Sequence, residues 1–147
     1  MSDAIEIDIL IVEDNPRDVE LGLRALRKHN LANKVAVVQD GAEALDFLFG
    51  VGAYANRERE PLPKVVLLDL KLPKIGGIEV LRKLRAEERT RLLPVVVMTA
   101  SEEERDIMET YQLGVNSYVV KPMDFTQFAK VVADLGYYWV FTNHGPF

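Results

Sequence analysis

The stretch IDILIVEDNP, residues 7–16, decides the fold of this chain. It joins a short apolar run, Ile7–Val12, to the acidic pair Glu13 and Asp14 and then to Asn15-Pro16. A short run that is apolar on both faces is typical of a strand in a parallel sheet with helices on each side. Asn is a favoured N-cap residue, and Pro is favoured at the first helical position. We therefore predict a buried strand that ends in two carboxylates and leads directly into a helix.

Similar apolar runs recur along the rest of the chain. They predict four more strands, at Val35–Val38, Val65–Leu68, Val95–Met98 and Tyr118–Val120. The segments between these runs have the period of amphipathic helices. Five repeats of strand and helix predict an α/β fold, a doubly wound five-stranded parallel sheet flanked by five helices.

Polar residues mark the expected helix starts. Three pairs have the spacing of a capping box, Asp40 with Glu43, Ser101 with Glu104, and Asp124 with Gln127. Another helix is expected from about Gly77 to about Glu87. The segment Val51–Lys64 is polar and interrupted by Gly and Pro, so we expect a surface excursion of unknown purpose there rather than a helix or strand.

Size and composition narrow the class of protein. A length of 147 residues fits one domain over residues 1–147, with an extended C-terminal helix and tail at about 124–147. The net charge of −5, without a basic stripe, argues against nonspecific nucleic-acid binding. The absence of cysteine excludes thiolate zinc sites and cysteine nucleophiles. No apolar run approaches the roughly 20 residues that span a bilayer, and no signal-peptide core is present, so we expect a cytoplasmic protein without a membrane segment.

Residues suited to a metal ion and a phosphate group end four of the predicted strands. Glu13 and Asp14 follow the first strand, Asp69 the third, Thr99 the fourth and Lys121 the fifth. Ligands of open α/β sheets bind beyond the carboxyl ends of the strands, so these side chains should meet at one edge. Three carboxylates would repel one another by about 4 kcal/mol per pair at ~4 Å and an effective dielectric near 20, and they need a cation. Oxygen ligands suit Mg²⁺ or Mn²⁺, so the sequence predicts a divalent-metal and phosphate site.

Each of these residues also has a purely structural interpretation. The acidic pair could cap a helix, and Asp69 could start a turn. Thr99 could be an ordinary β-branched strand residue, Lys121 an exposed lysine before a turn, and Tyr118 a half-buried aromatic at a strand edge. The combination of all of them in one chain favours the site.

Four segments of the sequence carry a family resemblance: ILIVEDNP (9–16), LLDLKLPKIGG (67–77), VMTA (97–100) and YVVKP (118–122). In this order and at these spacings they resemble the receiver domain of two-component response regulators, which has a flavodoxin-like fold. The resemblance implies that Asp69 accepts a phosphoryl group from a histidine kinase. It also implies a signalling protein that promotes its own phosphorylation and dephosphorylation, rather than an enzyme.

The resemblance implies a set of metal ligands. Asp14, Asp69 and the backbone carbonyl of Lys71 would bind Mg²⁺ or Mn²⁺ directly, and Glu13 would act through water. Glu13 stands where the family most often has Asp, and the Lys71 side chain is placed to reach the mouth of the site. Both differences bear on the lifetime of the phosphorylated form.

The resemblance also implies a switch. Thr99 would move its hydroxyl to the new phosphoryl oxygen, Lys121 would pair with the phosphoryl group, and Tyr118 would turn inward once Thr99 has moved. It favours a cis bond between Lys121 and Pro122, which the residues themselves do not decide.

Aromatic residues are concentrated near the C-terminus. One stripe comprises Phe125, Phe128, Val132, Leu135 and Trp139, and Tyr137–Phe141 continues it. One interpretation is a wide core face with a tail folded back on the domain. The other is a self-association surface, because aromatics are enriched at interfaces. On the second interpretation the candidate interface residues are Phe128, Tyr138 and Trp139.

A narrower resemblance sharpens the choice of partner. The motifs DNPRDV (14–19), DGAEALDFL (40–48), GVNSY (114–118) and PMDFTQF (122–128) resemble the stand-alone regulators that serve bacterial phytochromes. This implies a phytochrome-type histidine kinase as partner. It also implies a homodimer through the side formed by the helices that begin near Ser101 and Asp124. The downstream partner would be a protein whose identity the sequence does not give.

Three functions are compatible with such a fold. A switch, in which phosphorylation of Asp69 biases two conformations and changes a protein interface, fits best. The alternative is a phosphatase or phosphotransferase of the aspartyl-phosphate type, although Lys71 stands where that class needs a second acid. A nucleotide or flavin binder would need a Gly-rich phosphate loop, and the turn after the first strand reads Glu-Asp-Asn-Pro.

Overall fold

Five parallel strands form a single sheet in the order β2-β1-β3-β4-β5. The computed structural model describes residues 6–147, apart from the side chain of Asn33. The strands are β1 (Ile9–Val12), β2 (Val35–Val38), β3 (Val65–Leu68), β4 (Val95–Thr99) and β5 (Ser117–Val120). All five predicted strands are confirmed, with small shifts at their ends.

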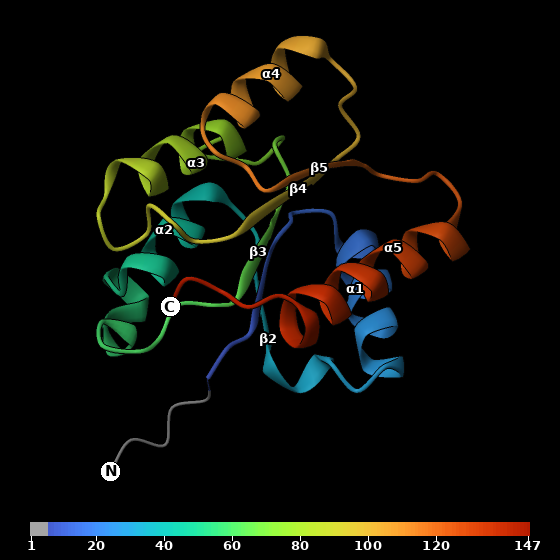
Figure 1. Ribbon diagram of the computed structural model, residues 1–147, viewed down its shortest axis with the longest axis horizontal. Coiled ribbons are helices and arrows are strands. Elements are labelled where there is room, and N and C mark those ends of the chain that lie inside the picture. The colour runs from blue at the N-terminus through green and yellow to red at the C-terminus, as the bar shows by residue number, and fades with distance from the viewer. Residues whose placement is uncertain (1–5) are drawn as a thin grey trace.

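In the described part of the chain, five α-helices cover the two faces of this sheet (Figure 1). They are α1 (Pro16–Lys28), α2 (Gly41–Phe49), α3 (Gly77–Ala86), α4 (Glu104–Gln112) and α5 (Phe125–Tyr137). Helices α1 and α5 pack together on one face, and α2, α3 and α4 lie on the other. The predicted doubly wound α/β fold is therefore confirmed. Within residues 6–147, no helix is both long enough and apolar enough to cross a membrane.

The central strands are buried on both faces. Every residue of β1, β3 and β4 is buried, because helices cover the sheet on each side. Leu26, Phe128 and Val132 pack on the α1–α5 face, and Leu48 and Leu81 pack on the other. Burying side chains of this size stabilises the fold by about 1.5–3 kcal/mol each. The packed core therefore holds the strands, and the residues at their ends, in fixed positions.

The register of the sheet aligns the strand ends. Val12 pairs with Val38 on β2 and with Leu68 on β3. The Asp69 N–H donates to the Val12 carbonyl at 3.1 Å. Glu13 and Asp69 each come directly after these paired residues, so they are neighbours at the carboxyl edge of the sheet.

Helix capping follows the sequence prediction at three of four helix starts. Asn15 Oδ1 accepts hydrogen bonds from the backbone N–H groups of Arg17 and Asp18, at 3.0 and 3.2 Å. The side chains of the N-cap residues Asp40 and Asp124 each accept from the N–H three residues on, at 2.7 and 2.9 Å.

The predicted capping box of Ser101 with Glu104 is wrong. Helix α4 begins at Glu104 with Glu103 as its N-cap, and no side chain caps it. Ser101 Oγ instead donates to Asp106 Oδ2 at 2.6 Å, and it accepts from the Glu103 N–H at 3.3 Å. The loop after β4 is longer than the sequence suggested, which places Ser101 outside the helix.

The excursion at Val51–Lys64 contains an element that the sequence did not predict. A 3₁₀ helix, η2 (Gly52–Arg57), packs against α2. The rings of Phe47 and Tyr54 meet edge to face at 5.1 Å, and the Arg57 guanidinium lies 4.2 Å from the centre of the Phe47 ring. Tertiary contacts with α2 therefore support this helix in spite of its polar sequence.

The C-terminal segment continues beyond α5 as a π-helical turn, η3 (Tyr138–Thr142). Residues 143–147 line a pocket of about 350 Å³ together with Trp139 and the segment 61–64. The red end of the chain accordingly lies beside the green segment before β3 (Figure 1). The tail thus folds back on the domain, as the first interpretation of the aromatic residues predicted.

Candidate functional site

The carboxyl edge of the sheet gathers the predicted site residues. Glu13 and Asp14 follow β1, Asp69 follows β3, and Lys121 follows β5. One carboxylate oxygen each from Glu13, Asp14 and Asp69 lies within 4.8 Å of the others. Glu13 and Asp69 are buried, at 6% and 8% exposure, while Asp14 is exposed. The site thus contains two buried acids and one acid that is exposed to solvent.

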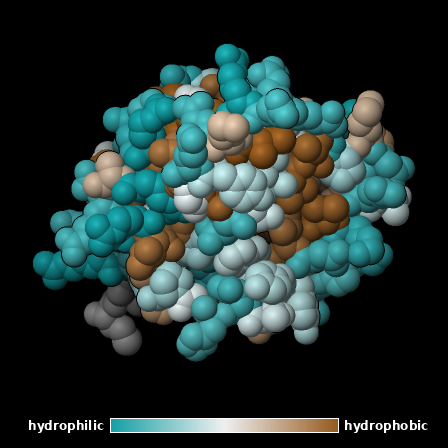
Figure 2. All heavy atoms as spheres, turned by 45° about the horizontal axis from the view of Figure 1, so that its top comes forward, coloured by the Kyte–Doolittle hydropathy of each residue, from teal (hydrophilic) through white to brown (hydrophobic). Residues whose placement is uncertain are grey.

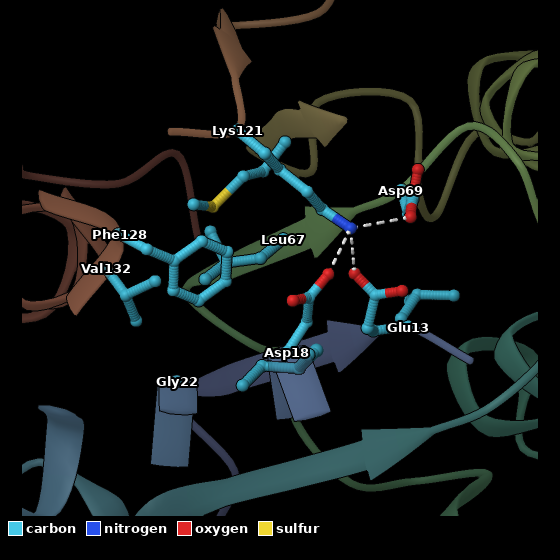
Figure 3. Close-up of a pocket in the computed structure, with 11 residues that line it drawn as sticks. Glu13, Asp18, Gly22, Leu67, Asp69, Lys121, Phe128 and Val132 are labelled. Carbon is cyan, nitrogen blue, oxygen red and sulfur yellow. Dashed lines mark hydrogen bonds and ion pairs between the residues drawn. The ribbon is translucent and has the colours of Figure 1, made fainter. Parts of the chain in front are cut away.

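The ammonium of Lys121 lies among the carboxylates (Figure 3). Its Nζ is 2.5 Å from Glu13 Oε1 and 2.9 Å from Asp69 Oδ2. It is also 2.9 Å from Asp18 Oδ2, on the first turn of α1. The Lys121 side chain is 13% exposed. This lysine therefore partly neutralises a cluster of acids that would otherwise repel one another.

Sequence reasoning missed Asp18 as a member of the site. Asp18 lies in the first turn of α1, where an acid is explained by the helix dipole alone. The available signal was its place in the motif DNPRDV, directly after the acidic pair. Only the tertiary structure, in which α1 packs against α5, shows that its carboxylate reaches Lys121.

Burial and charge set the protonation of the two buried acids differently. Burial, together with repulsion from Asp69, raises the pKa of Glu13 to about 7, although the hydrogen bond from Lys121 opposes the rise. Burial also acts to raise the pKa of Asp69, but its hydrogen bond and ion pair with Lys121 outweigh burial and lower it. Asp69 is thus the acid that stays ionised at neutral pH.

The pKa of Lys121 shifts in the opposite direction to that of Asp69. Burial acts to lower its pKa, but its hydrogen bonds to Glu13, Asp18 and Asp69 raise it above the usual value. The ammonium is therefore fully charged wherever the acids around it are ionised.

The donor set fits a hard divalent cation. The three clustered acids offer only carboxylate oxygens, and the exposure of Asp14 leaves room for retained waters, as Mg²⁺ and Mn²⁺ prefer. The Lys71 N–H donates to Asp69 Oδ1 at 3.2 Å, so the Lys71 peptide lies beside the cluster. Coordination by the Lys71 carbonyl stays a prediction.

Two glycines allow the starts of α2 and α3 to lie close to the loop after β3. A Cβ at Gly77 would lie 2.4 Å from the Asp69 carbonyl oxygen, and one at Gly41 would lie 1.9 Å from that of Ile75. Both distances are far below van der Waals contact. The starts of α2 and α3 therefore reach the loop after β3 only because these residues lack side chains.

The predicted switch residues are connected by hydrogen bonds through one loop. Thr99 is fully buried at the end of β4, and its Oγ1 accepts from the Ser101 N–H at 3.5 Å. The Tyr118 hydroxyl donates to the Ser101 carbonyl at 3.0 Å. Burial raises the pKa of Tyr118, which keeps the hydroxyl as a donor. The loop after β4 thus connects Thr99 to Tyr118 on β5 and, through Asp106, to α4.

Two expectations at this edge of the molecule are corrected. Residues 6–147 contain no cis peptide bond, so the bond between Lys121 and Pro122 is trans, against the cis form that the resemblance favoured. Phe128 is 6% exposed and packs in the core, so its ring is not available as an interface residue. Phe125, placed on the same stripe, is 52% exposed, and the Arg17 guanidinium lies 4.0 Å from its ring centre.

Comparison with known proteins agrees with this geometry. Residues 9–133 match the family described as the response regulator receiver domain. The bacteriophytochrome response regulator AtBRR is 52% identical in sequence, with 95% of this chain and 99% of that chain covered and a TM-score of 0.72. The phosphorylated cyanobacterial phytochrome response regulator RcpA is 36% identical, with 97% and 99% covered and a TM-score of 0.88. The Mn²⁺-bound form of response regulator Rcp1 is 34% identical, with 96% and 99% covered and a TM-score of 0.87.

Proposed function

Because the chain belongs to the response regulator receiver domain family, we propose that it accepts a phosphoryl group on Asp69 from a histidine kinase in a Mg²⁺-dependent reaction. One observation carries this proposal. The Asp69 carboxylate belongs to the acidic cluster that suits a divalent cation and also pairs with the ammonium of Lys121, so a bound metal ion and Lys121 would both place positive charge beside it. A similar structure that is phosphorylated and another that holds Mn²⁺ support it.

The reaction requires little of the protein beyond positioning. An oxygen of Asp69 forms a bond to phosphorus while the bond from phosphorus to the kinase histidine breaks, and the imidazole keeps the electron pair. The Lys71 N–H on Oδ1 and the Lys121 ammonium on Oδ2 hold the carboxylate in one orientation. When bound, the divalent ion neutralises charge on the transferred group. Asp14, Asp69 and the Lys71 carbonyl would hold that ion directly, and Glu13 would act through water.

The signal is a conformational change at a protein interface. Thr99 and Lys121 bind the oxygens of the new phosphoryl group, and Tyr118 follows the loop that contains Ser101. The hydrogen bond from the Tyr118 hydroxyl to Ser101 and the bond from Ser101 to Asp106 support this route. The output is contact with a protein partner in the cytoplasm, with no catalysis on an outside substrate.

The kinase partner is of the phytochrome type. Support comes from the similarity to AtBRR and RcpA, both named as phytochrome response regulators. The narrower sequence motifs, including DNPRDV, point the same way.

The chain forms a homodimer through the α4 and α5 side. Figure 2 brings forward the top of Figure 1, where α4 and β5 lie, and apolar side chains gather there among polar ones. Exposed apolar residues on these helices and the turn after α5 include Met108, Tyr111, Tyr138 and Phe141. Tyr138, which is 48% exposed, and the half-buried Trp139 beside it remain candidate interface residues.

Phosphate uptake tests the function directly. Incubation with acetyl phosphate and Mg²⁺ should add one acid-labile phosphate per chain, and Asp69→Asn should abolish it. Asp134→Asn is the matched control, because Asp134 is an exposed acid on α5 that pairs with Lys130. Equal labelling of Asp69→Asn and the wild type would refute the acceptor assignment.

A further inference from the structure

The three hydrogen bonds of Lys121 are not equivalent. An ammonium group has three donors, and here all three are used, on Glu13, Asp18 and Asp69 (Figure 3). A new acceptor at the site must therefore replace one of these partners. Which partner Lys121 keeps determines where its charge stays during the reaction.

Two of the three partners have other roles in the proposed reaction. Glu13 and Asp69 belong to the acidic cluster that fits a divalent cation, and Asp69 is also the group that becomes phosphorylated. Asp18 is outside that cluster and is not the acceptor. It is the one partner of Lys121 that remains available at every stage.

Asp18 is itself fixed in place. Its backbone N–H donates to Asn15 Oδ1 at 3.2 Å, which ties it to the start of α1. Its side chain is 21% exposed, so its charge is partly shielded from solvent, and its Oδ2 lies 2.9 Å from Lys121 Nζ. The Asn15 cap thus holds the backbone of Asp18 in place, and Asp18 gives the long, flexible lysine side chain a fixed point.

We propose that Asp18 is a positioning residue that holds the Lys121 ammonium beside Asp69 while Lys121 exchanges its bonds to Glu13 and Asp69 for bonds to the phosphoryl group. This inference rests on the proposed phosphorylation of Asp69. Asp18 touches neither the acceptor nor the transferred group. Its effect is to keep one charge-assisted hydrogen bond on Lys121 while the other two change.

Phosphorylation kinetics test the role. Asp18→Asn keeps the size of the side chain and removes its charge. At saturating acetyl phosphate and Mg²⁺, we expect its rate of phosphate uptake to fall about tenfold, because a misplaced charge is costly in a positioned site. The half-saturating acetyl phosphate concentration should change less than twofold. Glu20→Gln, which removes an exposed acid from the same helix, should react at the wild-type rate.

A second readout does not depend on phosphorylation. The ¹⁵N NMR signal of the Lys121 ammonium should be visible in the metal-free wild type, because protons in a buried ion pair exchange slowly with water. It should weaken or vanish in Asp18→Asn and persist in Glu20→Gln. An Asp18→Asn protein with the wild-type ammonium signal, or with the wild-type uptake rate, overturns the inference. A wild type that takes up no phosphate overturns the proposed function, while the ammonium signal still decides whether Asp18 holds Lys121.

Discussion

Lys121 balances the charge of the site at the scale of a single residue. Its partners Glu13 and Asp69 have side chains only 8% and 9% exposed. Removing one member of a buried ion pair leaves an uncompensated charge, which costs far more than the loss of an exposed pair. The lysine therefore stabilises the fold as well as the proposed chemistry.

Replacing Lys121 should show how far the stability of the fold depends on its charge. In metal-free protein, Lys121→Met should lower the free energy of unfolding by about 3 kcal/mol, because two buried acids lose their counter-ion. Added Mg²⁺ should recover part of the loss. Lys130→Met breaks an ion pair whose side chains are 75% and 65% exposed, and it should cost less than about 0.5 kcal/mol. Equal losses in the two variants, measured by urea unfolding, would contradict this account.

Glu13 gives the site a dependence on pH. Its pKa is raised to about 7 by burial and by Asp69, whereas the pKa of Asp69 is lowered. A raised pKa means that Glu13 in the metal-free protein takes up a proton as the pH falls through about 7. Since carboxylates must be ionised to favour a cation, that proton competes with the metal.

The affinity for Mg²⁺ should accordingly fall by about tenfold between pH 8 and pH 6. Titration calorimetry at both values measures the change. Glu13→Gln cannot titrate, so its weaker affinity should vary less than twofold over the same range. A wild type with equal affinities at pH 6 and pH 8 would be inconsistent with a protonated Glu13.

At the scale of elements, the packing of α1 against α5 holds Asp18 and Lys121 together. Beneath the carboxylates, the two helices leave a cavity of about 30 Å³ bordered by Gly22, Phe128 and Val132 (Figure 3). A Cβ at Gly22 would meet only Val132 Cγ1, at 3.8 Å. A Cβ at Gly136 would lie 2.6 Å from Leu26 Cδ2, within the core.

These two glycines should respond to alanine in opposite ways. Gly22→Ala should raise the free energy of unfolding by about 1 kcal/mol, because alanine is the better helix former and the space is open. Gly136→Ala should lower it by about 1 kcal/mol, because overpacking against Leu26 outweighs the same gain. Thermal and urea unfolding of both variants check the signs. Stabilisation by Gly136→Ala would show that Leu26 moves aside freely.

At the scale of the whole molecule, the site and the proposed dimer surface share elements. Helix α4 is connected to the site through Ser101 and Asp106, and α5 follows Lys121 in the chain. Arg85 of α3 donates to the carbonyls of Leu113 and Gly114, both at 2.9 Å, and so ties down the C-terminal end of α4. The N-terminal end of α4 is therefore the end that is connected to the site, through the loop after β4.

The oligomeric state should depend on the α4 and α5 side. Tyr138, at 48% exposure, directly follows α5, and Tyr138→Asp should shift a wild-type dimer toward monomer in sedimentation velocity. Val51→Asp is the control, because Val51 is an equally exposed apolar residue, at 48%, that follows α2 rather than α4 or α5. A wild type that is monomeric with and without a beryllofluoride mimic of phosphorylation would end the dimer proposal.

The sequence by itself determined the strands, most helix starts and the acids at the strand ends. Hydrophobic runs and caps such as Asn15 act over a few residues, so their outcome is written in the local sequence. The family resemblance, confirmed by the match over residues 9–133, added the expected role of Asp69.

Only the tertiary structure decided how distant segments meet. Asp18 and Lys121 are 103 positions apart, and no local pattern shows that they touch. The same holds for the burial of Phe128, for η2 against α2, and for Ser101 outside α4. These features depend on how whole helices pack on the sheet, because burial and ion pairing are properties of the assembled chain.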